Sequence, residues 1–201
     1  ITANPYLDLT VIALDDASAG QPAVGTVTLG ASASGSGVLT LYVGTHKVEI
    51  AIATSTAAAA VAAALEAELD KHPDLPVTAS VDGAVVTLTA KNKGLCGNDI
   101  HLSYVLTNVS TLTVSISAMA SGATNPTLAD ALAVVFGEKY DIIATPYNNQ
   151  TDLTTHKTHL DSVSGPMEQR PGVGVYGMNA ALSTVTTLTG QVNSGRILCA
   201  Y

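Results

Sequence analysis

The chain has 201 residues, of which 47% are hydrophobic and 12% are charged, and its formal net charge is -8 at pH 7. This composition excludes a disordered chain, and no apolar run approaches the ~20 residues that a membrane-spanning helix needs. The 16 acidic side chains outnumber the 8 basic ones, and the basic residues form no cluster, which argues against DNA or RNA binding. Cys96 and Cys199 lie far apart in the sequence, so a disulfide framework is not supported.

The first element is a continuous apolar run of strand length, Leu7–Leu14. Such a run predicts a strand that is covered on both faces of its sheet. A turn-rich linker, residues 15–22, follows it. Beyond the linker, apolar and polar residues alternate, which is typical of a half-exposed antiparallel sheet.

Two hairpins are expected in this alternating region. Residues 38–43 are followed by Gly44-Thr45-His46 and a second strand up to Ile52, and residues 77–81 and 84–89 flank Asp82-Gly83. Asp-Gly between two strands favours the type I′ turn, whose twist matches that of the strands.

An Ala-rich helix is predicted between the hairpins, over residues 56–71. Val61, Leu65 and Leu69 recur every four residues and form one apolar stripe. Thr54 or Ser55 is expected to cap its start, and Pro73 prevents its continuation. Two more alternating strands, residues 100–106 and 112–116, complete an α+β unit.

After a second linker, residues 121–126, helices and strands alternate. This order predicts a parallel sheet with right-handed crossovers. The helices are expected from Leu128 to Gly137, over 151–164 and over 180–189, and the strands over 140–145, 172–177 and 196–201.

The predicted fold class is α/β plus α+β. Because Leu7–Leu14 has the same buried-strand character as the C-terminal strands, it is assigned to their sheet. The result is a mainly parallel α/β sheet domain of residues 1–22 and 121–201. It is interrupted by an inserted, mainly antiparallel α+β domain of residues 23–120.

One glycine-rich run, Gly172–Gly177, matches the G-x-G-x-x-G pattern of dinucleotide sites. In a true fingerprint the glycines follow the strand and meet a helix N-terminus, with an acidic residue about 20 positions later. Here they lie within the predicted strand, and no such acidic residue follows. We interpret them as glycines that let a helix pack closely on the strand.

A second constellation, Asp152, His156 and His159, has the i, i+4, i+7 spacing that could direct three ligands toward one metal ion. The alternative interpretation is a solvated helix face, with Leu153 and Leu160 turned inward. No nucleophile elbow, P-loop or H-E-x-x-H motif occurs in the sequence. We therefore predict no catalytic residue, no metal site and no cofactor.

Several segments together resemble the tail sheath proteins of Mu-like contractile phages. The most specific is Lys91–Ile100 (KNKGLCGNDI), which is expected to form a tight connection into a strand. The others are residues 9–19 (LTVIALDDASA), residues 39–50 with the Ala-rich helix after them, the rest of 87–104, Asp141–Tyr147 (DIIATPY) and the Pro166-Met167 turn.

The resemblance implies a structural subunit and no enzyme. Such subunits polymerise around a tail tube as hexameric rings, then shorten and drive the tube through the host envelope. The implied partners are other sheath subunits and the tail tube protein. The implied location is the phage tail of the virion, assembled in the bacterial cytoplasm. At 201 residues the chain is expected to be a central fragment that lacks the family's terminal arms and C-terminal domain, and to be monomeric or weakly associated.

Two other functions stay open at this point. A surface adhesin or binding module is compatible with the Ser/Thr/Ala-rich strands and the acidic charge, although eight aromatic residues make an aromatic cleft hard to build. An α/β enzyme that binds a nucleotide or metal is compatible with the alternating strands and helices. Fold alone does not decide between them, because function resides in sites.

Overall fold

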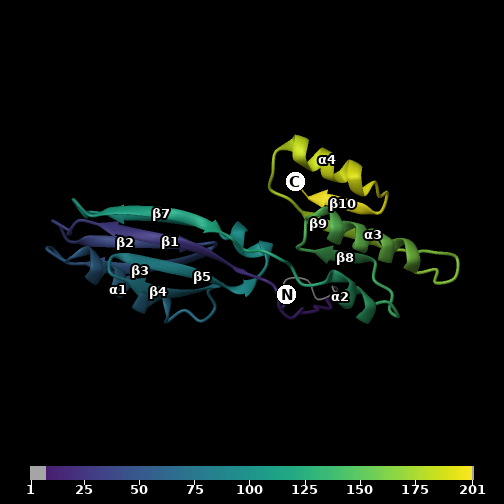
Figure 1. Cartoon of the computed structure of the whole chain (residues 1–201), viewed down its shortest axis with the longest axis horizontal. Coiled ribbons are helices and arrows are strands. Elements are labelled where there is room, and N and C mark those ends of the chain that lie inside the picture. Colours follow the sequence, from purple (N-terminus) through teal and green to yellow (C-terminus); the bar gives the residue numbers. More distant parts are fainter. Residues whose placement is uncertain (1–7, 201) are drawn as a thin grey trace. The chain divides into compact units, whose positions relative to one another are not determined.

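The computed structural model describes residues 8–200. The chain divides into two compact units, one formed by Ile1–Asp15 and Pro126–Tyr201 and the other by Asp16–Asn125 (Figure 1). Each unit has its own core and is described by itself.

The Asp16–Asn125 unit contains two antiparallel sheets and one long helix. One sheet has the strand order β4-β5-β1-β7 and the other β3-β2-β6. The strands are β1 (Pro22–Gly30), β2 (Gly37–Val43), β3 (His46–Ile52), β4 (Val77–Asp82), β5 (Val85–Lys93), β6 (Leu102–Thr107) and β7 (Thr113–Ala120). The helices are α1 (Ala58–Leu69) and the short 3-10 helix η1 (Leu95–Asp99).

A single core holds these elements together. Val27 of β1, Leu39 of β2 and Leu88 of β5 are fully buried, and Leu65 of α1 joins them in the same cluster. Burying a side chain of this kind contributes roughly 1.5–3 kcal/mol. The core therefore joins both sheets and α1 into one unit.

Both predicted hairpins are confirmed. β2 pairs with β3 and β4 pairs with β5, each antiparallel, and the turns place Gly44 and Gly83 at positive φ. Helix α1 lies within its predicted range, but its N-cap is Ala57, and no side chain caps it. Strand β1 lies in the alternating region beyond the linker, and it is central, since it pairs with both β5 and β7.

The other unit contains one small parallel sheet, of order β10-β9-β8, and three helices. The alternating helices and strands are present near their predicted positions. They are α2 (Leu128–Val134), β8 (Ile142–Thr145), α3 (Gln150–Val163), β9 (Val173–Gly177), α4 (Leu182–Val192) and β10 (Ile197–Ala200). Helix α4 runs through Gly190, the predicted stop, and ends instead at Val192, followed by the C-cap residue Asn193, whose φ of 45° is left-handed.

The predicted fold class is wrong. The sheets are mostly antiparallel, and the parallel sheet has only three short strands, so no large parallel α/β domain is formed. Leu7 lies outside the described residues, and the rest of the predicted strand Leu7–Leu14 has no regular secondary structure. Within it, Leu9 is 51% and Val11 is 77% exposed. An apolar run predicts a strand only where neighbouring strands satisfy its backbone, and here the run pairs with none of the described strands.

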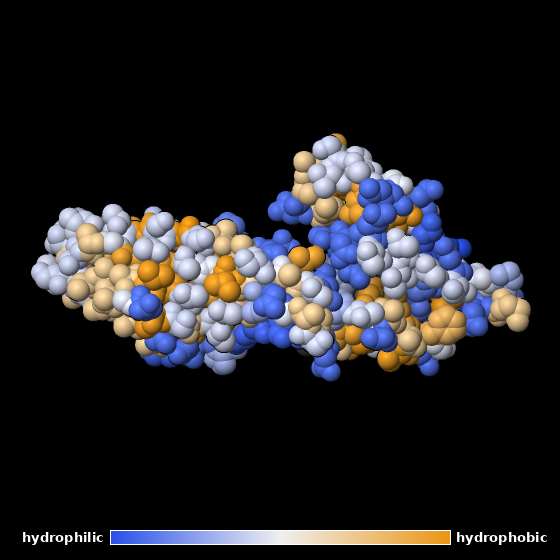
Figure 2. All heavy atoms as spheres, viewed as in Figure 1, coloured by the Kyte–Doolittle hydropathy of each residue, from blue (hydrophilic) through white to orange (hydrophobic). Residues whose placement is uncertain are grey.

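The surface of the described chain mixes polar and apolar side chains. In the space-filling view, hydrophobic residues reach the surface of both units and are interspersed with hydrophilic ones (Figure 2). Within residues 8–200, no helix combines the length and the apolar character needed to cross a membrane.

Candidate functional site

The most specific sequence element, Lys91–Ile100, forms a tight turn at the end of β5. Gly94 has a φ of 110°, a value that L-residues rarely adopt, and η1 follows it directly. A Cβ atom at Gly94 would lie 2.8 Å from the Oδ1 atom of Asn125. Only glycine therefore fits this position without strain.

Asn98, in η1, bonds to the second connection between the units. Its Nδ2 donates to the Gly122 carbonyl over 3.0 Å, and the Gly122 amide donates to its Oδ1 over 2.8 Å. The Asn98 side chain thus makes the same two hydrogen bonds to the Gly122 backbone that a residue of a neighbouring strand would make. Gly122 is buried, and a Cβ there would lie 2.4 Å from the Gly94 carbonyl oxygen.

The first connection bonds to the same turn. The Gln21 carbonyl accepts from the amides of Gly94 (3.0 Å) and Ala123 (3.1 Å), and the Gln21 amide donates to the Ala123 carbonyl over 2.9 Å. The Leu95 amide donates to Asn125 Oδ1 over 2.7 Å. We call this set, Gln21, Gly94, Asn98, Gly122 and Asn125, the clamp. It fastens both ends of the Asp16–Asn125 unit to one turn.

The three residues of the possible metal site do not form one. Asp152 lies in the first turn of α3 and bonds to the Asn149 side chain and, through its amide, to Asn149 Oδ1. His156 and His159 are buried, which corrects the alternative interpretation of a solvated face. Among residues 8–200, no group of three His, Cys, Asp or Glu side chains is placed to hold a metal ion.

His156 packs against the glycine of the central parallel strand. It is 0% exposed, and neither ring nitrogen has a hydrogen-bond partner within the described chain. A Cβ at Gly174 would lie 2.7 Å from His156 Cε1 and 2.9 Å from Leu160 Cδ1. Gly174 therefore lets α3 approach β9 closely, and the glycine run lies in a strand rather than in a phosphate-binding loop.

Burial also sets the protonation of these histidines. Desolvation, with the nearby His159 adding to it, lowers the pKa of His156 to about 4. Desolvation and the Arg170 charge lower the pKa of His159. The His159 ring meets Phe136 edge-on at 5.9 Å, and the Arg170 guanidinium lies over the same Phe136 ring. Both histidines are neutral structural groups at pH 7.

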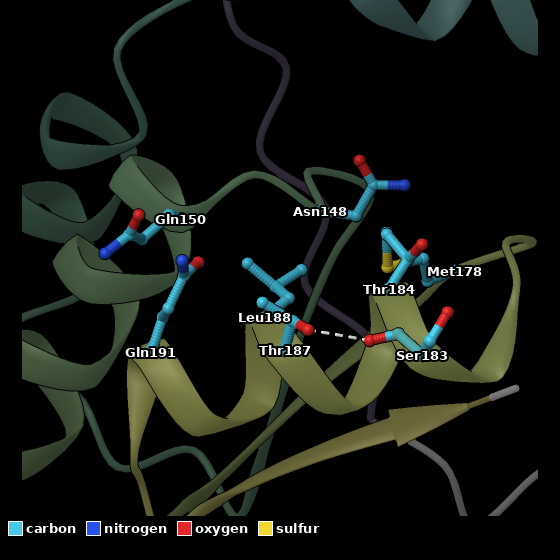
Figure 3. A pocket seen from close by; sticks show the side chains of 8 residues that line it. All are labelled: Asn148, Gln150, Met178, Ser183, Thr184, Thr187, Leu188 and Gln191. Atoms are coloured by element: carbon cyan, nitrogen blue, oxygen red, sulfur yellow. Dashed lines mark hydrogen bonds between the residues drawn. The ribbon is translucent and has the colours of Figure 1, made fainter.

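An open groove of about 470 Å³ lies beside α4 (Figure 3). Leu188 and Met178 supply apolar surface, and the Thr187 hydroxyl already donates to the Ser183 carbonyl over 2.8 Å. None of the lining side chains is ionisable, so the groove offers no general acid or base. Its lining residues are Asn148, Gln150, Met178, Ser183, Thr184, Thr187, Leu188 and Gln191.

The clamp generates a stability prediction. Replacing Asn98 with Ala removes two hydrogen bonds and leaves the buried Gly122 amide and carbonyl unpaired, so we expect a loss of about 2 kcal/mol in the free energy of unfolding. Urea unfolding measures it, with the exposed neighbour Asn92→Ala as the control that changes little. Equal stability of the two variants would contradict the role of Asn98.

The buried histidine generates a pH prediction. His156 titrates near 6.5 when unfolded but at about 4 when folded, so the unfolded state binds the extra proton as the pH falls through this range. Stability from this residue is complete above pH 6.5 and declines toward pH 4, by about 3 kcal/mol in total.

Urea unfolding of wild type and His156→Leu, each at pH 7.5 and pH 4.5, tests this. The variant keeps the carboxylates that also titrate, so only the difference in acid sensitivity is diagnostic. We expect the wild type to lose about 2–3 kcal/mol more than the variant on acidification. The same loss in both proteins would show that the neutral form of His156 does not matter.

Comparison with known proteins gives one strong match. Over 194 residues, 94% of its length, the chain is 30% identical to the Mu-like prophage FluMu tail sheath protein of Haemophilus influenzae. This match confirms the resemblance seen in the sequence. The chain spans 40% of that relative's length. No family profile matches the sequence.

Solved structures give weaker likenesses. The flagellar cap protein FliD of Serratia marcescens (D2-D3 domains) aligns at 11% identity and a TM-score of 0.26, over 56% of this chain and 83% of that one. FliD of Escherichia coli (D1-D2-D3 domains) aligns at 15% identity and a TM-score of 0.29, over 86% of this chain and 59% of that one. TM-scores this low do not establish a shared fold.

Proposed function

We propose that this chain, which belongs to the tail sheath family of Mu-like phages, is a structural part of a contractile tail sheath. The sequence match over 94% of the chain carries the proposal. In it, the full-length subunit polymerises around the tail tube as hexameric rings and contracts to drive the tube through the host envelope. Its partners are other sheath subunits and the tail tube protein, and its location is the virion tail, assembled in the host cytoplasm.

The clamp supports a mechanical role. A sheath subunit that changes its contacts by moving as a rigid body must keep its own elements in register while it moves. The bonds from Gln21, Gly94 and Asn98 hold both ends of the Asp16–Asn125 unit at one point. A force applied to one connection therefore acts on hydrogen-bonded backbone rather than on an unpaired loop.

The domain arrangement is part of the same proposal. We propose that residues 23–120 are an inserted domain and that residues 1–22 with 121–201 form the sheath core domain of the subunit. The insertion enters and leaves through neighbouring connections, since Gln21 pairs with Ala123. It could then project outward and vary without disturbing the lattice.

No catalytic role is proposed. The possible metal ligands are a carboxylate that accepts a hydrogen bond from the N-cap residue Asn149 and two buried, neutral histidines, and the groove beside α4 is lined without an ionisable side chain. The relative's name describes a structural protein. The observations on the described residues therefore favour shape and self-contact as the basis of function.

Electron microscopy of the full-length tail sheath protein carrying this sequence tests the proposal. We expect purified protein, alone or with tail tube protein, to form hollow cylinders with sixfold end-on symmetry. The 201-residue chain by itself is the control, and we expect it to sediment as a monomer. A full-length protein that stays monomeric at high concentration, with and without the tube protein, would contradict the sheath function.

A further inference from the structure

One face of the parallel sheet carries all three helices of its unit. Leu153 of α3 and Leu188 of α4 pack with Tyr176 of β9, and Leu132 of α2 packs in a cluster with Ile143 of β8. The side chains of the three strands alternate, so Ile143, Gly174 and Tyr176 face the helices. We call this the inner face.

The outer face consists only of apolar side chains, and all of them except the half-buried Val175 are exposed. Ile142 is 67% and Leu198 is 60% exposed, and Val173 is 36% exposed. Register places Ile142 beside Val173, and Ala144 beside Val175, which neighbours Leu198. The complete face is Ile142, Ala144, Val173, Val175, Leu198 and Ala200.

The topology explains why this face is bare. The strand order β8-β9-β10 follows the chain in one direction, and parallel crossovers are right-handed, so α3 and α4 must lie on the same side. No connection between β8 and β10 can therefore reach the outer face. Parallel sheets, however, occur almost only with both faces covered. Something outside these crossovers has to cover it.

The size of the outer face indicates which kind of element covers it. Three strands about 4.8 Å apart give a width of about 10 Å, and four residues at about 3.3 Å give a length of about 13 Å. An α-helix with its side chains is about 10–12 Å across. A stable dimer buries about 800 Å² on each partner, far more than this face offers. The face fits one helix and is too small to hold a second copy by itself.

Chemistry and length indicate where the helix comes from. A face without a single polar side chain resembles a protein interior, whereas reversible interfaces have polar rims. The Haemophilus relative is much longer than the match, which covers 40% of it. We propose that the outer face seats one amphipathic helix from the part of the full-length sheath protein outside this chain. This inference rests on the proposed function only through the family, which supplies the longer polypeptide.

Hydroxyl-radical footprinting with mass spectrometry tests the proposal without any substitution. It is applied to this chain and to unassembled full-length protein carrying the sequence. We expect severalfold less oxidation of Ile142 and Leu198 in the full-length protein. Val105 of β6, which is 49% exposed in the other unit, is the matched control and should be oxidised equally in both. Equal oxidation of Ile142 and Leu198 in both proteins would overturn the proposal.

A pair of charge substitutions gives a second readout. Leu198→Lys and Val105→Lys both place a charge on an exposed strand position, so in this chain both should change the melting temperature by only a few degrees. In the full-length protein we expect Leu198→Lys to lower it by at least about 5 °C more than Val105→Lys, because the charge would be buried under the helix. Equal shifts of the melting temperature would overturn the proposal. It would also be overturned if this chain formed a dimer that the Leu198→Lys substitution abolished, because the outer face would then bind a second copy.

The two proposals can fail separately. If full-length subunits form cylinders while Ile142 and Leu198 remain exposed, the sheath function is supported and the proposal of a covering helix is refuted. Protection of both residues in a full-length protein that never polymerises would do the reverse.

Discussion

One set of hydrogen bonds, at the turn after β5, holds the two connections of the Asp16–Asn125 unit together. Asn98 satisfies the backbone of Gly122 on both sides, and the Gln21 carbonyl accepts from two amides that belong to different parts of the chain. Gly94 allows the turn, because its φ of 110° and the nearby Asn125 leave no room for a side chain.

In the other unit, the two faces of the parallel sheet differ. Its helices cover the inner face of a three-stranded parallel sheet, where Gly174 leaves room for the buried His156 side chain. The buried imidazole contributes shape and stays neutral, since its pKa is about 4. The opposite face is apolar and bare. Helices cover one face of this sheet and leave the other uncovered, so the uncovered face is available for further polypeptide to pack on.

Local patterns in the sequence predicted the local structure well and its long-range part poorly. The Asp82-Gly83 turn and the Leu65 stripe each encode their element within a few residues. The position of β1 between β5 and β7 depends on pairing with residues about 60 and 90 positions away, which no local pattern shows. The apolar run up to Leu14 was assigned to the parallel sheet. With that strand included, the parallel sheet was predicted to be larger than it is. The burial of His156 could have been inferred only by noticing that Gly174 is a strand glycine needing a close neighbour.

The chain has two units, each with its own core, a clamp at the ends of one unit and an exposed apolar face on the other. The clamp is the central element of this account, and native-state hydrogen exchange tests it most directly. The amides of Gly94, Gly122 and Ala123 should exchange as slowly as core amides of β1, only when the whole Asp16–Asn125 unit unfolds. Exchange at the rate of exposed loops, while β1 stays protected, would show that the connections are not held and would contradict the account.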